Sequence, residues 1–235
     1  MKLEDLKKMR QGDADYEFPI PTQELVERYE AVFTAAVNDV LREMGYVYQT
    51  LPNTIQGLSP DMKVAGIAFT LKGSKNLDIV DEMPERARML DAIPKDAVCV
   101  WDTSNDDESA QWGEIMTMAA KMRGARGAIV DGGVRDTDRV LQQRFPVFAR
   151  FRSSNGMLGR FRMIGYQVPI RVGEVAIHPG DVLLGDIDGV IVVPRKLAYD
   201  VLLKAEYIRD NEVEIKKMVL SGLKAVDIVD RGGYF

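Results

Sequence analysis

Apolar residues recur at helical spacing in four stretches of the chain, with short β-rich runs between them. The first stretch covers residues 22–44, with Thr22 as the predicted N-cap and Gly45 at the expected C-cap position. The other helical patterns and the strand-like runs alternate along the chain. Helices are predicted at 83–93, 112–122 and 196–220, and strands at 64–71, 97–101, 127–130 and 146–148. This alternation predicts an α/β fold.

The later part of the chain is richer in short strands. Runs of β-rich composition are separated by Gly, Pro and Asp turns, as at 178–181. These runs predict strands at 166–172, 174–177, 181–184 and 189–193. We expect residues 1–21 to form an N-terminal extension and 22–235 a single α/β domain with a β-rich middle and helical ends, because no linker divides the chain.

Composition narrows the possible partners. The 235 residues are 46% hydrophobic and 29% charged, which is typical of a globular protein. A net charge of −5 argues against a nucleic-acid or anionic-membrane binder, which normally shows a basic excess. No apolar run approaches the roughly 20 residues that span a bilayer, and the charged N-terminus lacks the apolar core of a signal peptide. We therefore expect a cytoplasmic protein that contacts neither nucleic acid nor membrane.

The counts of cysteine and histidine restrict metal chemistry. Cys99 is the single cysteine and His178 the single histidine, so intrachain disulfides and zinc sites built on Cys or His are excluded. Any bound metal must be held mainly by carboxylates and water, which favours Mg²⁺ or Mn²⁺. In the predicted fold Cys99 is a buried strand residue and His178 a turn residue. Asp186 and Asp188 are interpreted as turn acids, and the acidic run 102–108 as a solvated loop. The alternatives are that one of these two aspartates touches a ligand and that the acidic run borders the site.

The segment 124–136 is the most informative for chemistry. Residues 127–130 predict a buried strand that emerges at Asp131, and we expect Gly132 and Gly133 to form a tight turn. Arg135 and Asp136 then follow at a strand end, where open α/β sheets tend to bind ligands. A guanidinium can grip a carboxylate, while a carboxylate binds a hard cation. The alternative is an ordinary strand end with a surface Arg–Asp pair.

A second candidate lies at the predicted start of the helix near 112. A helix N-terminus offers unpaired N–H groups and the positive end of a dipole, which suit an anionic ligand. Glu114 falls in this first turn. The alternative interpretation is that Glu114 only complements the helix dipole.

These two segments together carry a family resemblance. Trp112-Gly113-Glu114, followed by 20 residues and then Arg135-Asp136, resembles the acidic-x20-Arg-Asp signature of the RraA-like family. That family includes class II pyruvate aldolases acting on 4-hydroxy-4-methyl-2-oxoglutarate and 4-carboxy-4-hydroxy-2-oxoadipate. Similar motifs occur in the family's order, so the resemblance covers about residues 30–215. They are 65–70 (AGIAFT), 146–150 (PVFAR), 179–181 (PGD) and 185–194 (GDIDGVIVVP).

The resemblance implies a compact α/β/β fold of the swivelling-domain type, assembled as homotrimers or homohexamers with sites between subunits. It implies that Arg135 holds the pyruvyl group, that Asp136 ligates Mg²⁺ or Mn²⁺, and that Glu114 touches the metal through water. Gly113 and the backbone amides of Ile115 and Met116 are implied to bind the substrate carboxylate. The resemblance also implies a metal-site Glu from a neighbouring subunit's C-terminal helix, which a rough alignment places at Glu212.

The implied activity is that of a metal-dependent lyase. It would cleave a 4-hydroxy-2-oxo acid to pyruvate and a second oxo compound, and the same enolate chemistry would decarboxylate oxaloacetate. A Schiff-base mechanism is discounted because Lys121, the nearest lysine in sequence, is expected to be solvated. The alternative is a non-catalytic regulator that binds a ribonuclease or another protein. Residues 151–155 (FRSSN), where the family usually turns on Gly, together with Arg160 and Arg162, suggest an altered substrate mouth.

Overall fold

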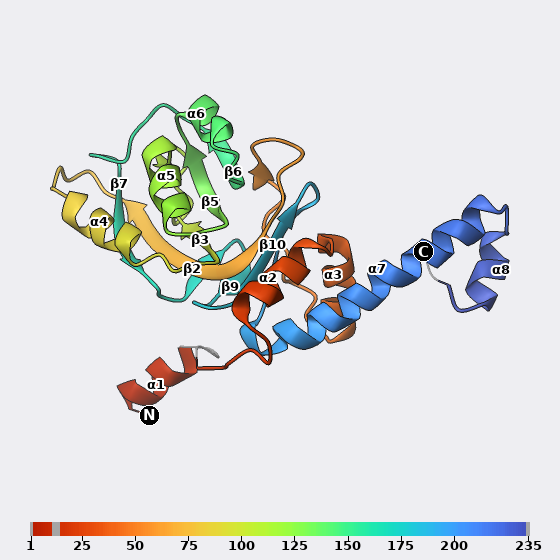
Figure 1. Ribbon diagram of the computed structural model, residues 1–235. Coiled ribbons are helices and arrows are strands. Elements are labelled where there is room, and N and C mark those ends of the chain that lie inside the picture. Colours follow the sequence, from red (N-terminus) through yellow and green to blue (C-terminus); the bar gives the residue numbers. More distant parts are fainter. Residues whose placement is uncertain (1, 11–14, 234–235) are drawn as a thin grey trace.

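A computed structural model describes residues 2–10 and 15–233 (Figure 1). Most of its strands belong to one mixed sheet. Its order is β1-β6-β5-β3-β2-β10-β11, with β4 added beside β5 and β7 beside β2. The strands are β1 (Gln56–Gly57), β2 (Val64–Lys75), β3 (Ala97–Asp102), β4 (Ala110–Trp112), β5 (Gly127–Val134), β6 (Val147–Arg152), β7 (Phe161–Tyr166), β10 (Val182–Asp186) and β11 (Gly189–Val193). Strands β2, β3, β5 and β6 are parallel neighbours, as alternation of strands and helices requires.

The sheet curves until its two ends are joined by one segment. The amide of Leu51 donates to the carbonyl of Val190 at 2.9 Å, and the amide of Val192 donates to that of Gln49 at 2.9 Å. The same segment then continues into β1, which pairs with β6 at the other end of the sheet. The result is a nearly closed barrel (Figure 1). Its buried interior is shared with a hairpin of β8 (Ile170–Val172) and β9 (Val175–Ile177).

Helices cover the outer face of this sheet in two groups. The first group, α4 (Met83–Asp91), α5 (Glu114–Met122) and α6 (Thr137–Gln142), lies over β3, β5 and β6 (Figure 1). The second, α2 (Thr22–Glu30), α3 (Thr34–Glu43) and α7 (Ala198–Leu220), packs against β10 and β11. Helix α7 then extends away from the barrel and carries α8 (Ala225–Asp230) at its far end (Figure 1). No helix of the described residues is long and apolar enough to cross a bilayer.

The N-terminal segment is partly packed against this second helix group. Helix α1 (Leu3–Arg10) lies apart from the barrel, and residues 11–14 fall outside the described part. Arg195 Nε donates to the carbonyl of Tyr16 at 2.6 Å, and its guanidinium lies 4.5 Å from the ring centre of Phe18. The second half of the predicted extension therefore contacts the domain.

The single helix predicted over 22–44 is wrong, because the chain forms two helices there. The break follows from a cap that comes from another part of the chain. Asp186, the last residue of β10, accepts hydrogen bonds from the amide of Thr34 at 2.8 Å and from its hydroxyl at 2.7 Å, and a new helix, α3, starts there. This contact agrees with the interpretation of Asp186 as a structural acid. Thr22 is the first helical residue rather than the cap, and Gly45 ends α3 with a φ of 86°, as predicted.

The predicted tight turn at Gly132–Gly133 is also wrong. Strand β5 continues to Val134, and both glycines are buried within it. Their role is close packing against the neighbouring segment. A Cβ on Gly133 would lie 2.5 Å from the carbonyl oxygen of Ser109, and one on Gly132 would collide with the side chain of Gln111. The helix predicted from 112 begins at Glu114, because Trp112 belongs to β4.

Candidate functional site

A cavity of about 560 Å³ lies where β4 and β5 end, with α4 and the loop at 156–158 as its further walls. It is lined by every site residue predicted within one chain: Gly113, Glu114, Ile115, Met116, Arg135 and Asp136. The cavity thus brings together residues from several segments between α4 and this loop. Glu212 is not among the lining residues. It lies on α7, where it pairs with Lys216 at 2.9 Å, so its predicted role in a neighbouring subunit stays a prediction.

Parallel pairing of β4 with β5 brings the two sequence motifs together. Ala110 pairs with Gly133 and Trp112 with Val134, and the amide of Arg135 donates to the carbonyl of Trp112 at 3.0 Å. The residues that follow the two strands therefore emerge side by side at the carboxyl edge of the sheet, which is where ligands bind in α/β folds.

The first backbone amides of α5 have no hydrogen-bond partner within the helix. The amide and the hydroxyl of Thr117 both donate to the carbonyl of Gly113, at 3.0 and 2.9 Å, and the indole of Trp112 donates to that hydroxyl at 2.8 Å. Among the described residues no side chain caps this helix. The amides of residues 114–116 precede the first intrahelical hydrogen bond, so the cavity has an anion-binding end.

Gly113 is required by the crowding around it. A Cβ at this position would lie 2.9 Å from Oδ2 of Asp136 and 3.2 Å from Cγ of Arg135. Any side chain here would push the carboxylate or the guanidinium out of place. The glycine thus lets the helix N-terminus approach both charged groups closely.

Arg135 and Asp136 form the charged wall of the cavity. Nε of Arg135 lies 3.4 Å from Oδ2 of Asp136, and the two side chains are 49% and 38% exposed, so both are open to a ligand. Asp136 has left-handed backbone angles (φ 52°, ψ 36°) and precedes α6 without capping it through its side chain. A non-glycine residue in this conformation costs free energy and is common at functional sites.

Glu114 is held by α6 across the cavity edge. Its Oε2 accepts a hydrogen bond from Nη1 of Arg139 at 3.1 Å, and its carbonyl accepts one from Nε2 of Gln143 at 3.1 Å. The hydrogen bond to Glu114 is the main cause of the raised pKa of Arg139. The side chain of Glu114 remains 26% exposed, so it is oriented but still reachable.

The donor set of this cavity fits a hard divalent cation. Asp136 and Glu114 offer carboxylate oxygens, and Mg²⁺ is commonly held by one or two carboxylates with water and substrate oxygens in the other positions. In the described part of the chain, no group of three or more His, Cys, Asp or Glu side chains is arranged to hold a metal alone. Asp136 and Glu114 would therefore hold such an ion only together with oxygens from elsewhere, such as water or substrate.

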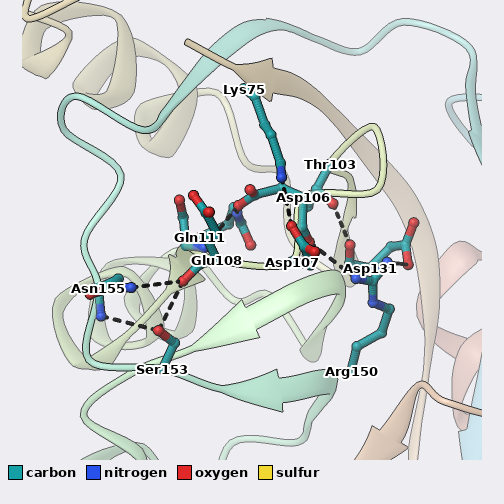
Figure 2. A network of polar contacts seen from close by, with 11 residues as sticks. Lys75, Thr103, Asp106, Asp107, Glu108, Gln111, Asp131, Arg150, Ser153 and Asn155 are labelled. Atoms are coloured by element: carbon teal, nitrogen blue, oxygen red, sulfur yellow. Dashed lines mark hydrogen bonds and ion pairs between the residues drawn. The ribbon is translucent and has the colours of Figure 1, made fainter. Parts of the chain in front are cut away.

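Sequence reasoning missed a buried polar network beside this cavity. The loop at 102–108 was expected to be solvated, and this is wrong for Asp102 and Asp106, which are 4% and 0% exposed. Asp102 is paired with Lys72 at 2.7 Å. Asp131, which we predicted only as a strand end, pairs with Arg150 at 3.2 Å, and burial raises its pKa (Figure 2). The feature of the sequence that could have indicated this network is the Gly132–Gly133 pair. Because glycine has no side chain, these two residues leave space for the network's side chains.

The remaining sequence predictions concern the mouth of the site and isolated residues. A second cavity of about 360 Å³ shares Arg135 and Asp136 with Arg152, Ser153 and Ser154, so the unusual segment 151–155 does border the site. Arg162 lies instead on β7, 3.9 Å from Glu82. Cys99 is buried, and burial raises the pKa of its thiol to about 12, which agrees with an inert core residue.

Comparisons with known proteins identify relatives of this chain. A protein of Halalkalibacterium halodurans, provisionally named 4-hydroxy-4-methyl-2-oxoglutarate aldolase, is 28% identical over 86% of this chain and 92% of its own length. Protein DlpA of Legionella pneumophila is 29% identical over 80% of this chain, but the match spans only 30% of DlpA. The chain thus corresponds to less than a third of that relative.

Solved structures extend the comparison. A crystal structure described as that of novel cellulases from microbes associated with the gut ecosystem is 49% identical, with a TM-score of 0.87 over 91% of this chain and 96% of that one. Streptomyces coelicolor RraAS2, described as an unusual member of the RNase ES inhibitor RraA protein family, is 25% identical. Its TM-score is 0.75 over 86% of this chain and 100% of that one. The family model described as "RraA-like: Aldolase/RraA" matches residues 34–192. With the fold, the motif spacing and this match in agreement, the chain belongs to the RraA-like family.

Proposed function

We propose that this protein is a divalent-metal-dependent lyase that cleaves a 4-hydroxy-2-oxo acid to pyruvate and a second oxo compound. One observation carries the proposal. A single cavity joins uncapped helix amides, an exposed guanidinium and two carboxylates, all within one small volume. Cavities of this size enclose small molecules. The name of the Halalkalibacterium relative supports the same reaction class.

The chain's own residues account for substrate binding. The amides of Ile115 and Met116 and the positive end of α5 would receive the substrate carboxylate, with Arg135 holding the pyruvyl group beside them. Asp136 and Glu114 would hold Mg²⁺ or Mn²⁺, which supplies Lewis-acid polarisation of the 2-oxo group. Gly113 keeps these groups close together, because it adds no side chain between them.

The reaction then needs one proton removed and one negative charge stabilised. Glu114, oriented by Arg139, is the carboxylate placed to take the proton of the C4 hydroxyl, directly or through water. The C3–C4 bond breaks, C4 becomes a carbonyl carbon, and its bonding electron pair forms the enolate of pyruvate. Arg135 stabilises the developing enolate charge, and protonation at C3 completes pyruvate. Loss of carbon dioxide from oxaloacetate would leave the same enolate, so we include that activity in the proposal.

We expect EDTA to abolish pyruvate release, and Mg²⁺ or Mn²⁺ to restore it. The measurement is pyruvate formation coupled to lactate dehydrogenase, with oxaloacetate and a panel of 4-hydroxy-2-oxo acids as substrates. Carboxymethyl cellulose is tested separately, by release of reducing sugars, because one similar structure is described as that of cellulases. If folded, metal-loaded protein releases no pyruvate from any of these substrates, the lyase is contradicted and the alternative of a non-catalytic regulator is favoured. The Streptomyces relative is described as a member of an RNase inhibitor family.

The proposal also includes a site shared between subunits of a homotrimer or homohexamer. Glu212 lies on α7 beside residues of α3, and the family resemblance implies a neighbouring subunit's glutamate at this position. We expect Asp136→Ala and Glu212→Ala proteins to be inactive alone and to regain activity when mixed subunits are reassembled. Lys217→Ala, on the same helix and exposed, is the matched control and should behave as wild type. Verified mixed oligomers without any rescue would contradict the shared site.

A further inference from the structure

Strand β4 is held in the sheet by a side chain as well as by its backbone. This strand has only three residues, and its pairing with β5 is irregular between Ala110 and Trp112. The residue between them, Gln111, is 1% exposed. Its Oε1 accepts a hydrogen bond from the amide of Gly133 at 2.9 Å, so a side-chain amide bridges the two strands at the irregular step.

The space for this bridge comes from β5. A Cβ on Gly132 would collide with Oε1 of Gln111 and lie 2.9 Å from Cγ2 of Thr103. The side-chain amide of Gln111 thus occupies the volume that a side chain at 132 would otherwise fill. This explains why the glycine lies inside a buried strand, where glycine normally weakens the structure.

The other end of the bridge is anchored by a buried carboxylate. Nε2 of Gln111 donates to Oδ2 of Asp106 at 2.5 Å, and the amide of Ser109 donates to the same oxygen at 3.0 Å. Nη2 of Arg150 donates to the carbonyl of Asp106 at 3.1 Å, while Nη1 contacts Asp131 at 3.2 Å (Figure 2). Asp106 is itself fully buried, so this anchor is shielded from water. Hydrogen bonds of charged groups are strongest in such a buried environment.

We propose that Gln111, held by Asp106, is a positioning residue that fixes the amides of α5 relative to Arg135. The inference rests on the proposed function. Gly113 follows Gln111 by two residues, and Arg135 follows Gly133 by two, so the bridge lies two residues before each half of the site. Catalysis by positioned groups is sensitive to displacements of about 1 Å. The two halves must therefore be kept in register, and the side-chain bridge of Gln111 holds their two strands together.

The first test compares Gln111→Ala with Ser109→Ala. The hydroxyl of Ser109, in the loop just before β4, is equally buried and has no hydrogen-bond partner among the described residues, so its removal leaves the bridge intact. We expect kcat of Gln111→Ala to fall about 10²-fold well below its Tm, and kcat of Ser109→Ala to stay within about twofold of wild type. A Tm loss in Gln111→Ala with unchanged kcat would mean a merely structural role and would overturn the proposal.

The second test exchanges the amide of residue 111 and the carboxylate of residue 106 and asks whether activity returns. Gln111→Glu places two carboxylates against each other and should be as impaired as Gln111→Ala. Adding Asp106→Asn lets the new asparagine donate to Glu at position 111, whose other oxygen still accepts from the Gly133 amide. The double variant should therefore have a kcat at least about tenfold higher than that of Gln111→Glu. A double variant no better than Gln111→Glu would contradict the bridge.

A third measurement separates this inference from the lyase itself. In Gln111→Ala we expect the Gly133 amide to exchange with solvent about tenfold faster, and the crystal structure to show residues 113–116 displaced from Arg135. Both readouts work even if the wild-type protein cleaves nothing in the panel. Unchanged exchange and an unmoved α5 N-terminus would overturn the positioning role, whatever the outcome for the activity.

Discussion

Arg135→Lys is expected to lower kcat/KM for pyruvate release about a hundredfold, which corresponds to about 2.7 kcal/mol of transition-state stabilisation. The reason is geometric. The guanidinium lies between Asp136, 3.4 Å from its Nε, and the backbone at Gly156, where even a Cβ would be 3.0 Å from Nη1. In this position the planar guanidinium can donate two parallel hydrogen bonds to a ligand carboxylate. A lysine ammonium keeps the charge but gives only a point contact.

The matched control is Arg160→Lys, because Arg160 is also an exposed arginine and lies outside both cavities formed by the described residues around Arg135. It should have wild-type kinetics. Near-wild-type kcat/KM in Arg135→Lys would show that charge alone is needed, and the role proposed for the guanidinium would be lost.

Asp136→Asn is expected to abolish metal-dependent turnover, with a loss of about a thousandfold or more. Asparagine tolerates the left-handed backbone conformation that Asp136 adopts, with φ of 52°, so the start of α6 should be preserved. What the variant removes is the negative charge that a hard cation prefers. Asp136→Ala should lose the same activity, and also some stability, because alanine is disfavoured in that conformation.

Mn²⁺ binding measured by electron paramagnetic resonance provides a readout that does not depend on turnover. We expect Asp136→Asn to bind Mn²⁺ at least about tenfold more weakly than wild type. Asp138→Asn changes a neighbouring carboxylate that is exposed and does not line the cavity, so it should bind as wild type does. Full activity in Asp136→Asn would remove Asp136 from the proposed metal site.

The parts of the fold that depend on local pattern were predictable. The strands beginning at Val64, Ala97 and Gly127 start where their apolar runs start, because burial on both faces leaves a continuous hydrophobic run. The joining of Glu114 with Arg135 and Asp136 was anticipated only through the family resemblance. Spacing alone does not reveal that β4 pairs with β5.

The failures share one physical origin, which is contact between residues distant in sequence. Asp186 caps α3 from 152 residues away, so a continuous apolar pattern becomes two helices. Gly132 and Gly133 resemble turn residues locally, yet they lie inside a strand because Gln111 and Ser109 pack against them. Asp106 resembles a surface acid, yet it is buried, and the amides that donate to its Oδ2 come from Ser109 and Gln111 once β4 is in place. Local propensity is overridden wherever such tertiary partners exist.

The position of β2 in the sheet has a consequence for biosynthesis. β2 pairs with β3 on one side and with β10 and β7 along the other, and β10 begins at Val182, more than 100 residues after β2 ends at Lys75. At translation speeds of about 5–20 residues per second, the edge of β2 that will pair with β10 waits on the order of 10 s on the ribosome. During that interval an apolar strand edge is exposed to other nascent chains. This protein should therefore depend on chaperones that shield such edges, and its yield on expression should fall as synthesis is slowed between these two strands.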